Sequence, residues 1–210
     1  MSKAVSLENF GYVKGVLPQP LFDSLKEECN LAEKERYSPT GSAKELISGL
    51  TGNGVPKHYY VEKNKDELNQ FILNFLIHEY EPAFRYVKEF KMLTKSVPIV
   101  HQEAWINIQE KNEFIPNHQH DGIISYVIYI KIPYDVYEET SKGDNASCFQ
   151  FTYVSTVGDI RTSTIRIDKT WEGTIMMFPA KLQHCVYPFY KSDDRRISIS
   201  GNVSFNTGEE

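Results

Sequence analysis

From Pro98 to the end of the chain, the sequence reads as a succession of short strands, and this feature constrains the fold more than any other. The strand-like runs are rich in β-branched and aromatic residues and are separated by turn signals, such as those at 142–145 and 157–159. The runs cover residues 99–109, 123–132, 147–155, 161–168, 173–178, 184–189 and 195–205. Regularly spaced strands with such turns predict a β-sandwich or a jelly roll.

The sequence before Pro98 favours helices instead. Apolar residues recur at helical spacing within 21–29, directly behind two prolines. Residues 65–90 carry a longer helical pattern with an apolar stripe, and Pro82 should kink or split that helix. Residues 1–15 are expected to form an initial strand or an extended lead-in.

Residues 37–57 contain many Ser, Gly, Pro, Thr and Asn residues and are predicted to be mostly loop, with room for a short helix over 43–50. Neither an internal repeat nor a low-complexity segment divides the chain. We therefore expect one domain over 1–210. It should be mostly β, with a helical part over 1–98 packed on a jelly-roll core over 99–205.

Composition excludes several classes of protein. A formal net charge of −5 argues against a general nucleic-acid binder. The N-terminus does not read as a signal peptide, and no apolar run approaches the roughly 20 residues that span a bilayer. Three cysteines without a CxxC motif predict a reducing compartment and no disulfide framework. We therefore expect a cytoplasmic protein without a membrane partner.

Three histidines stand at strand entrances. His118 and His120 lie at the mouth of the apolar run 123–130, and His184 follows the apolar run 174–179. In an extended chain, residues i and i+2 point to the same side, so His118 and His120 should face one cavity. This arrangement predicts a metal site, although imidazole suits Fe, Zn, Cu and Ni about equally.

A simpler interpretation of the His-x-His stretch is that one of its two histidines is a hydrogen-bonded surface residue. The remaining histidines, His58, His78 and His101, lie before the predicted barrel or at its start. We expect them to be structural or exposed, as single histidines usually are.

Arg196 opens an alternating strand over 196–203 and therefore shares one face with Ser198, while Arg195 should point outward. A guanidinium inside a barrel needs an anionic partner, and a carboxylate bound through two hydrogen bonds is the natural one. The Ser198 hydroxyl can donate to the same carboxylate. These two residues therefore predict a carboxylate-binding site.

Along the chain, the two histidines of the His-x-His stretch come first, then His184, and then Arg196 with Ser198. This order resembles that of the 2-oxoglutarate/Fe(II)-dependent dioxygenase superfamily. The closer resemblance is to a branch of oxygenases common in bacteria and phages, with Trp-x-Asn, His-x-His, Leu-Ser-Gly-x-x-Tyr, Phe-Pro-x-x-x-x-His and Arg-Ile-Ser-x-x-Asn. The matching residues are Trp105, Asn107, His118, His120, Ser125, Tyr129, Phe178, Pro179, His184, Arg196, Ile197, Ser198 and Asn202. The match covers about 99–205, while the N-terminal helices match only in general type.

The resemblance implies a double-stranded β-helix, or jelly roll, and a hydroxylating enzyme. Such an enzyme uses Fe(II), 2-oxoglutarate and O₂ and releases succinate and CO₂. Carried over by position, the metal ligands are His118, His120 and His184. Arg196 with Ser198 would bind the distal carboxylate of 2-oxoglutarate.

Two further residues have a role only through the resemblance. Tyr129 would reach the cosubstrate carboxylate, the alternative being a core aromatic residue. Asn107 would contact the cosubstrate or the substrate, the alternative being a hydrogen-bonding residue at a strand end. The substrate is a small molecule or a protein side chain, with 134–147 as one wall of its entrance and 38–57 as a lid. A homodimer is the default expectation.

One position departs from the pattern of the superfamily, whose usual triad has two histidines and one carboxylate. Here His120 occupies the carboxylate's position and Asp121 follows it. Alternation aims Asp121 away from His118, but a bulge at Asp121–Gly122 would re-aim it. We expect three histidine ligands, with Asp121 replacing His118 or His120 as the alternative.

Three other classes of protein compete with this interpretation. A cupin shares the jelly roll and the histidines but has no need for Arg196-x-Ser198. A non-enzymatic barrel, such as a capsid, tail or carbohydrate-binding module, would show no metal dependence. A degenerate oxygenase kept as a scaffold or sensor would account for the missing carboxylate.

Overall fold

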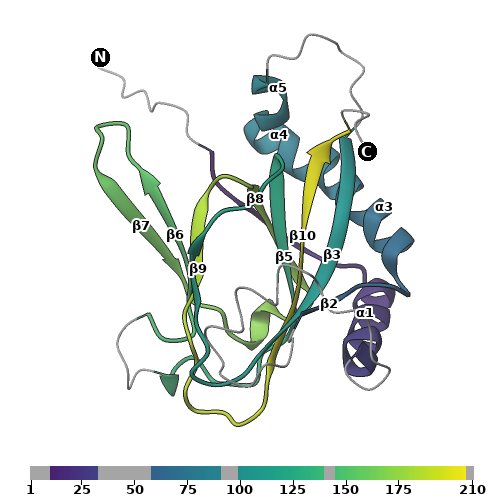
Figure 1. The fold of residues 1–210 in the computed structure, drawn as a ribbon, viewed down its shortest axis with the longest axis vertical. Coiled ribbons are helices and arrows are strands. Elements are labelled where there is room, and N and C mark those ends of the chain that lie inside the picture. The colour runs from purple at the N-terminus through teal and green to yellow at the C-terminus, as the bar shows by residue number, and fades with distance from the viewer. Residues whose placement is uncertain (1–9, 33–57, 91–98, 140–144, 207–210) are drawn as a thin grey trace, which may run out of the picture.

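Two antiparallel β-sheets face each other in the computed structural model, which describes residues 10–32, 58–90, 99–139 and 145–206 (Figure 1). The larger sheet has six strands in the order β1-β8-β5-β10-β3-β2, and the smaller has four in the order β4-β9-β6-β7. The strands are β1 (Val13–Val16), β2 (His58–Tyr60), β3 (Ile99–Gln109), β4 (Ile115–His118), β5 (Ile124–Lys131), β6 (Phe149–Val154), β7 (Ile160–Ile165), β8 (Thr174–Pro179), β9 (Gln183–Val186) and β10 (Arg196–Phe205).

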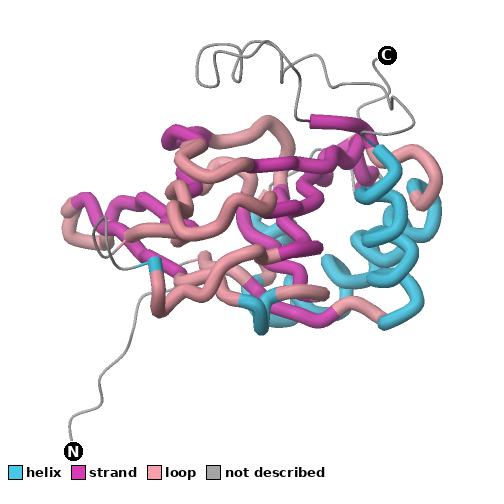
Figure 2. The backbone as a smooth tube through the Cα atoms, turned by 90° about the horizontal axis from the view of Figure 1, so that it is seen from below, coloured by secondary structure: helices cyan, strands magenta, loops and turns pink. Residues whose placement is uncertain are grey.

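Helices cover the outer face of the larger sheet, and Figure 2 shows them gathered on one side of the strands. They are α1 (Gln19–Ala32), α3 (Lys65–Phe75), the π-helical turn η1 (Leu76–Tyr80), α4 (Glu81–Phe84) and α5 (Tyr86–Glu89), and a 3₁₀ turn, η3 (Lys169–Trp171), precedes β8. The arrangement is a jelly roll packed against α-helices, so the predicted mostly β fold is confirmed.

The predicted break near Pro82 takes a particular form. Pro82 lies in the first turn of α4, directly after the π-helical turn η1. Proline has no backbone N–H and crowds the carbonyl four residues earlier, so a widened turn before it relieves both problems. The direction of the chain changes only at Arg85, which has the left-handed φ of 54°.

The central strand β5 is buried on both faces. Its even-numbered residues, such as Tyr126 and Ile128, pack into the cluster shared with the helices. Val127 and Tyr129 pack into a second cluster between the two sheets. Burial on both sides explains why the sequence of β5 is almost continuously apolar instead of alternating.

The long strands match their predicted ranges closely, and β1 overlaps the initial strand expected within 1–15, but β2 was not predicted. β1 and β2 form the two edges of the larger sheet, so the part before Pro98 contributes strands as well as helices. The short strand β4, which contains Pro116, was also not predicted. The predicted loop over 37–57, with its short helix and lid, lies outside the described residues.

Two expectations about the chain as a whole can be compared with the structure. Among the described residues, no helix combines the length and the apolar character that crossing a bilayer requires. Cys29, Cys148 and Cys185 are buried and form no disulfide.

Candidate active site

His118, His120 and His184 come together where β4 meets β9. His118 and His184 are direct cross-strand partners, and their ring centroids are 4.2 Å apart. His120 follows β4, and its backbone N–H donates to the carbonyl of Ala180 at 2.9 Å. One ring nitrogen from each histidine lies within 4.8 Å of the others. The structure therefore brings the three predicted ligands into one group.

Hydrogen bonds orient two of these imidazoles. Nδ1 of His118 lies 2.7 Å from the Pro116 carbonyl oxygen, and Nδ1 of His184 lies 2.9 Å from the Leu182 carbonyl oxygen. A carbonyl only accepts, so the proton is on Nδ1 in both residues. The Nε2 lone pairs therefore remain available to a metal, as is usual for histidine ligands.

The surroundings of His120 and His184 favour the neutral form of each imidazole. His184 is buried and stacks on Phe149 with ring centroids 5.3 Å apart. Desolvation, together with the neighbouring His118, lowers the pKa of His184 to about 3 and that of His120 to about 4. A neutral imidazole is the form that binds metals, so the group suits a metal at neutral pH.

Asp121 does not join the group. Its side chain is fully exposed, and its carboxylate pairs with Nζ of Lys181 at 3.1 Å. Gly122 turns the chain with a φ of 98°, but this turn leaves the Asp121 carboxylate outside the cluster of possible ligands among the described residues. The geometry therefore favours three histidines over the alternative set with Asp121.

Arg196 is buried, and its hydrogen-bond partners among the described residues are all neutral. Its Nε and Nη2 donate to Oε1 of Gln109 at 3.1 and 2.5 Å, and Nη1 donates to the Tyr134 hydroxyl at 2.9 Å. The carbonyls of Ser147 and Tyr187, each at 3.1 Å, complete the set. Within the described ranges, no carboxylate forms an ion pair with Arg196. Its charge is therefore held in place but not neutralised.

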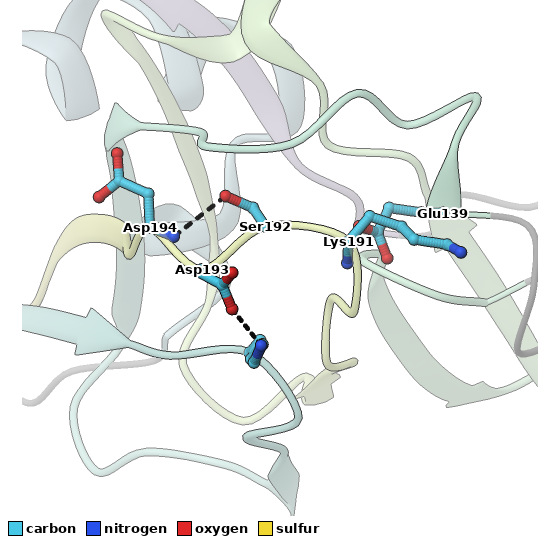
Figure 3. A network of polar contacts seen from close by, with 6 residues as sticks. Glu139, Lys191, Ser192, Asp193 and Asp194 are labelled. Carbon is cyan, nitrogen blue, oxygen red and sulfur yellow. Dashed lines mark hydrogen bonds and ion pairs between the residues drawn. The ribbon is translucent and has the colours of Figure 1, made fainter.

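The loops around Arg196 are themselves tied together (Figure 3). The buried Glu139 carboxylate accepts the backbone N–H groups of Tyr190 and Lys191 at 2.7 and 2.8 Å. Farther along the same loop, the Ser192 hydroxyl accepts the N–H of Asp194 at 3.1 Å. Glu139 thereby joins the segment after β5 to the loop between β9 and β10, which supplies one carbonyl to Arg196.

Tyr129 presents a hydroxyl with no partner. The hydroxyl is buried and makes no hydrogen bond in the described part of the molecule. Burial raises the pKa of Tyr129, while the charge of Arg196 acts in the opposite direction, so the phenol keeps its proton. A buried polar group without a partner is costly, and a bound oxygen ligand would satisfy it.

These groups line one cavity of about 460 Å³ between the two sheets. Asn107, Ser198 and Tyr129 form one row across β3, β10 and β5, because they are successive cross-strand partners. The Asn107 amide donates to the hydroxyls of Ser200 and Ser198, at 2.9 and 3.4 Å. The cavity therefore contains every residue that the sequence placed in the metal and carboxylate sites.

Several residues of the cavity wall were not predicted to belong there, among them His58 and Gln109. His58 was expected to be structural or exposed, but it lies on β2 opposite Asn107 and lines the cavity, where burial lowers its pKa to about 4. No pattern in the sequence indicated β2, a strand of three residues. Gln109 also lines the cavity, and its alternation with Asn107 on one strand was the available signal.

The sequence of this region matches a known family. Residues 103–202 match the family model described as "Putative 2OG-Fe(II) oxygenase". No curated protein sequence matches the chain.

Solved structures with the same fold share little sequence with the chain. A prolyl-4-hydroxylase from Pseudomonas putida is 12% identical with a TM-score of 0.55, and the match covers 93% of this chain and 92% of that one. A viral collagen prolyl hydroxylase from Paramecium bursaria Chlorella virus-1, in complex with 2-oxoglutarate, is 14% identical with a TM-score of 0.50, and coverage is 91% and 94%. These likenesses show the fold.

Proposed function

Because the chain belongs to the 2-oxoglutarate/Fe(II)-dependent oxygenase superfamily, we propose that His118, His120 and His184 hold its iron and that Arg196 holds its 2-oxoglutarate. When bound, iron with 2-oxoglutarate and O₂ supplies the oxidising power that hydroxylates a substrate, with release of succinate and CO₂. The protein contributes the position of each group and the exclusion of water.

The histidines are suited to this role by their tautomers. The carbonyls of Pro116 and Leu182 hold Nδ1 of His118 and His184, so each Nε2 can bind a metal without first losing a proton. Three neutral imidazoles supply one negative charge fewer than the usual triad with a carboxylate. The metal and its other ligands then have a more positive net charge, which favours binding of an anionic 2-oxo acid.

The cosubstrate pocket is supported by one observation above all. Among the residues that the structure describes, the buried Arg196 guanidinium has no carboxylate partner and the buried Tyr129 hydroxyl has no hydrogen-bond partner, and both line the same cavity. The distal carboxylate of 2-oxoglutarate would supply a negative charge beside the guanidinium and a hydrogen-bond acceptor for the Tyr129 hydroxyl. The Ser198 hydroxyl accepts from Asn107 and can donate its own proton to the same carboxylate. A cupin has no use for this arrangement.

We further propose a single domain over 1–210 that acts in the cytoplasm, as a homodimer, on a small molecule or a protein side chain. The net charge of −5 supports a substrate other than nucleic acid. Buried cysteines that form no disulfide fit a reducing compartment.

An anaerobic titration tests the proposal. Protein stripped of metal is titrated with Fe(II) and then with 2-oxoglutarate, and the visible charge-transfer band that requires both is recorded. We expect the band in the wild type and no stoichiometric iron in His184→Ala. Arg196→Met should weaken 2-oxoglutarate binding by about 100-fold, as loss of a buried charged partner does, while Fe(II) affinity is retained.

Arg195→Met, one residue away, is the matched control and should bind both ligands normally. Iron binding without any band in the wild type would favour a cupin. No metal binding at all would overturn the proposal, and unchanged 2-oxoglutarate affinity in Arg196→Met would remove this residue from the pocket.

A further inference from the structure

We propose that Gln109 is a positioning residue for the cosubstrate arginine. Its carboxamide fixes the Arg196 guanidinium while leaving the positive charge available to the distal carboxylate of 2-oxoglutarate. The inference rests on the proposed function, because it takes Arg196 as the residue that binds the cosubstrate.

The two side chains meet across neighbouring strands. Gln109 ends β3 and is the direct cross-strand partner of Arg196, which begins β10. Both are buried, with 7% and 3% of their surface exposed. Oε1 of Gln109 accepts from Nε and Nη2 of Arg196, the pair of N–H groups along one edge of the guanidinium. This contact sets the plane of the guanidinium.

The other end of the same amide is also fixed. Nε2 of Gln109 donates to the backbone carbonyl of Glu113 at 2.5 Å. A guanidinium only donates and a carbonyl only accepts, so the site needs an acceptor at one end and a donor at the other. A carboxamide satisfies both demands. An ionised carboxylate at this position would place an oxygen against the Glu113 carbonyl.

It matters for cosubstrate binding that residue 109 is a neutral glutamine and not a glutamate. A glutamate at position 109 would form a buried ion pair with Arg196 and would compete with any carboxylate that enters the cavity. The other acceptors of Arg196, the Tyr134 hydroxyl and the carbonyls of Ser147 and Tyr187, are also neutral. Among these four residues Gln109 alone lines the cavity, so it is the partner on the cosubstrate's side.

The test compares two 2-oxo acids that differ only in distal charge. Anaerobic Fe(II)-loaded protein is titrated with 2-oxoglutarate and with 2-oxoglutaramate, whose distal end is a neutral carboxamide. The variants are Gln109→Glu, Gln109→Met and the control Gln102→Glu, which adds the same charge at an exposed position of β3. Both Gln109 variants lose the hydrogen bond to Glu113, but only the glutamate adds a charge.

We expect the wild type and Gln102→Glu to prefer 2-oxoglutarate by about tenfold or more, because the charged carboxylate binds the guanidinium more strongly. Gln109→Glu should weaken 2-oxoglutarate by about 10- to 100-fold and abolish the preference. Gln109→Met should weaken 2-oxoglutarate by about three- to tenfold, because the guanidinium loses the contact that orients it but gains no competing charge, and should keep the preference.

A wild-type preference in Gln109→Glu would overturn the role of charge, and wild-type affinity in Gln109→Met would overturn the positioning role. The methionine variant decides the second point even if the glutamate variant folds poorly. A wild type that binds Fe(II) but not 2-oxoglutarate would instead count against the proposed function itself.

Discussion

The three imidazoles that could hold a metal differ in what positions them. His118 and His184 are oriented by hydrogen bonds from Nδ1 to carbonyls. His120 is positioned by its backbone bond to Ala180 and by contact with the Trp105 ring, 5.8 Å between centroids. Because all three reach one point, each should contribute separately to metal affinity.

The unusual ligand can be assigned by comparing His120 with its neighbour Asp121. We expect His120→Ala to lower Fe(II) affinity by at least about 100-fold. Replacing a residue that only contacts a metal ligand already lowers metal affinity by up to about 100-fold, and loss of a ligand should lower it at least as much. Asp121→Ala should change it by less than about threefold, because an exposed ion pair such as the one with Lys181 contributes little. Competition with a metal chelator measures both, and Gln119→Ala serves as the control. Loss of iron in Asp121→Ala alone would assign the carboxylate instead.

Among the elements, the loops between strands complete the pocket that the strands begin. β3 and β10 place Gln109 and Arg196 side by side, but two carbonyl partners of Arg196 come from outside those strands. Tyr187 directly follows β9, and Ser147 precedes β6 with a left-handed φ of 63°. The buried carboxylate of Glu139 holds the loop between β9 and β10, which begins at Tyr187, against the segment after β5.

Removing that tie should loosen the pocket. We expect Glu139→Ala to lower the free energy of unfolding by about 2–4 kcal/mol, because two backbone N–H groups lose a charged acceptor. Affinity for 2-oxoglutarate should fall several-fold while Fe(II) affinity holds, since the histidines lie on other segments. Urea unfolding and the anaerobic titration check both effects. The exposed neighbour Glu138 provides the control variant, Glu138→Ala. Equal effects of the two variants would contradict the role of Glu139 in holding the loop.

In the molecule as a whole, the two faces of the larger sheet lie in different environments. Its inner face lines the cavity, and its outer face is sealed under the helices. On the strand β3, His101 lies 2.7 Å from the Tyr126 hydroxyl, and desolvation together with the charge of Lys65 lowers its pKa to about 4. This histidine is structural, as the sequence predicted.

The partly buried His101 should make the fold sensitive to acid. A histidine in the unfolded chain has a pKa near 6.5. Between pH 6.5 and pH 4, the unfolded chain therefore binds a proton at His101 that the folded chain does not bind. The contribution of the neutral His101 to the free energy of unfolding is therefore fully present above pH 6.5, and it is lost as the pH falls toward 4. Between pH 7 and pH 5, the free energy of unfolding should fall in both proteins. We expect the fall to be about 1–2 kcal/mol smaller in His101→Gln than in the wild type. Urea unfolding with a chelator present measures this, and parallel curves for the two proteins would contradict it.

The local pattern of the sequence determined much of this protein. Alternation within 196–203 placed Arg196 and Ser198 on one face, and the spacing of His118 and His120 aimed both at one cavity, because side-chain direction in a strand follows from period two alone. The apolar runs likewise predicted the long strands of the core, since burial on both faces requires them.

Only the tertiary structure decided which distant residues meet. His58 entered the cavity because β2 pairs with β3, and that pairing has no local signature in three residues. The anion expected beside Arg196 is the carboxylate of a ligand, and the residue that holds the guanidinium within the protein, the neutral Gln109, is brought opposite it by the register of β3 and β10. Register and packing are set by the energy of the whole core, which a local reading of the sequence does not contain.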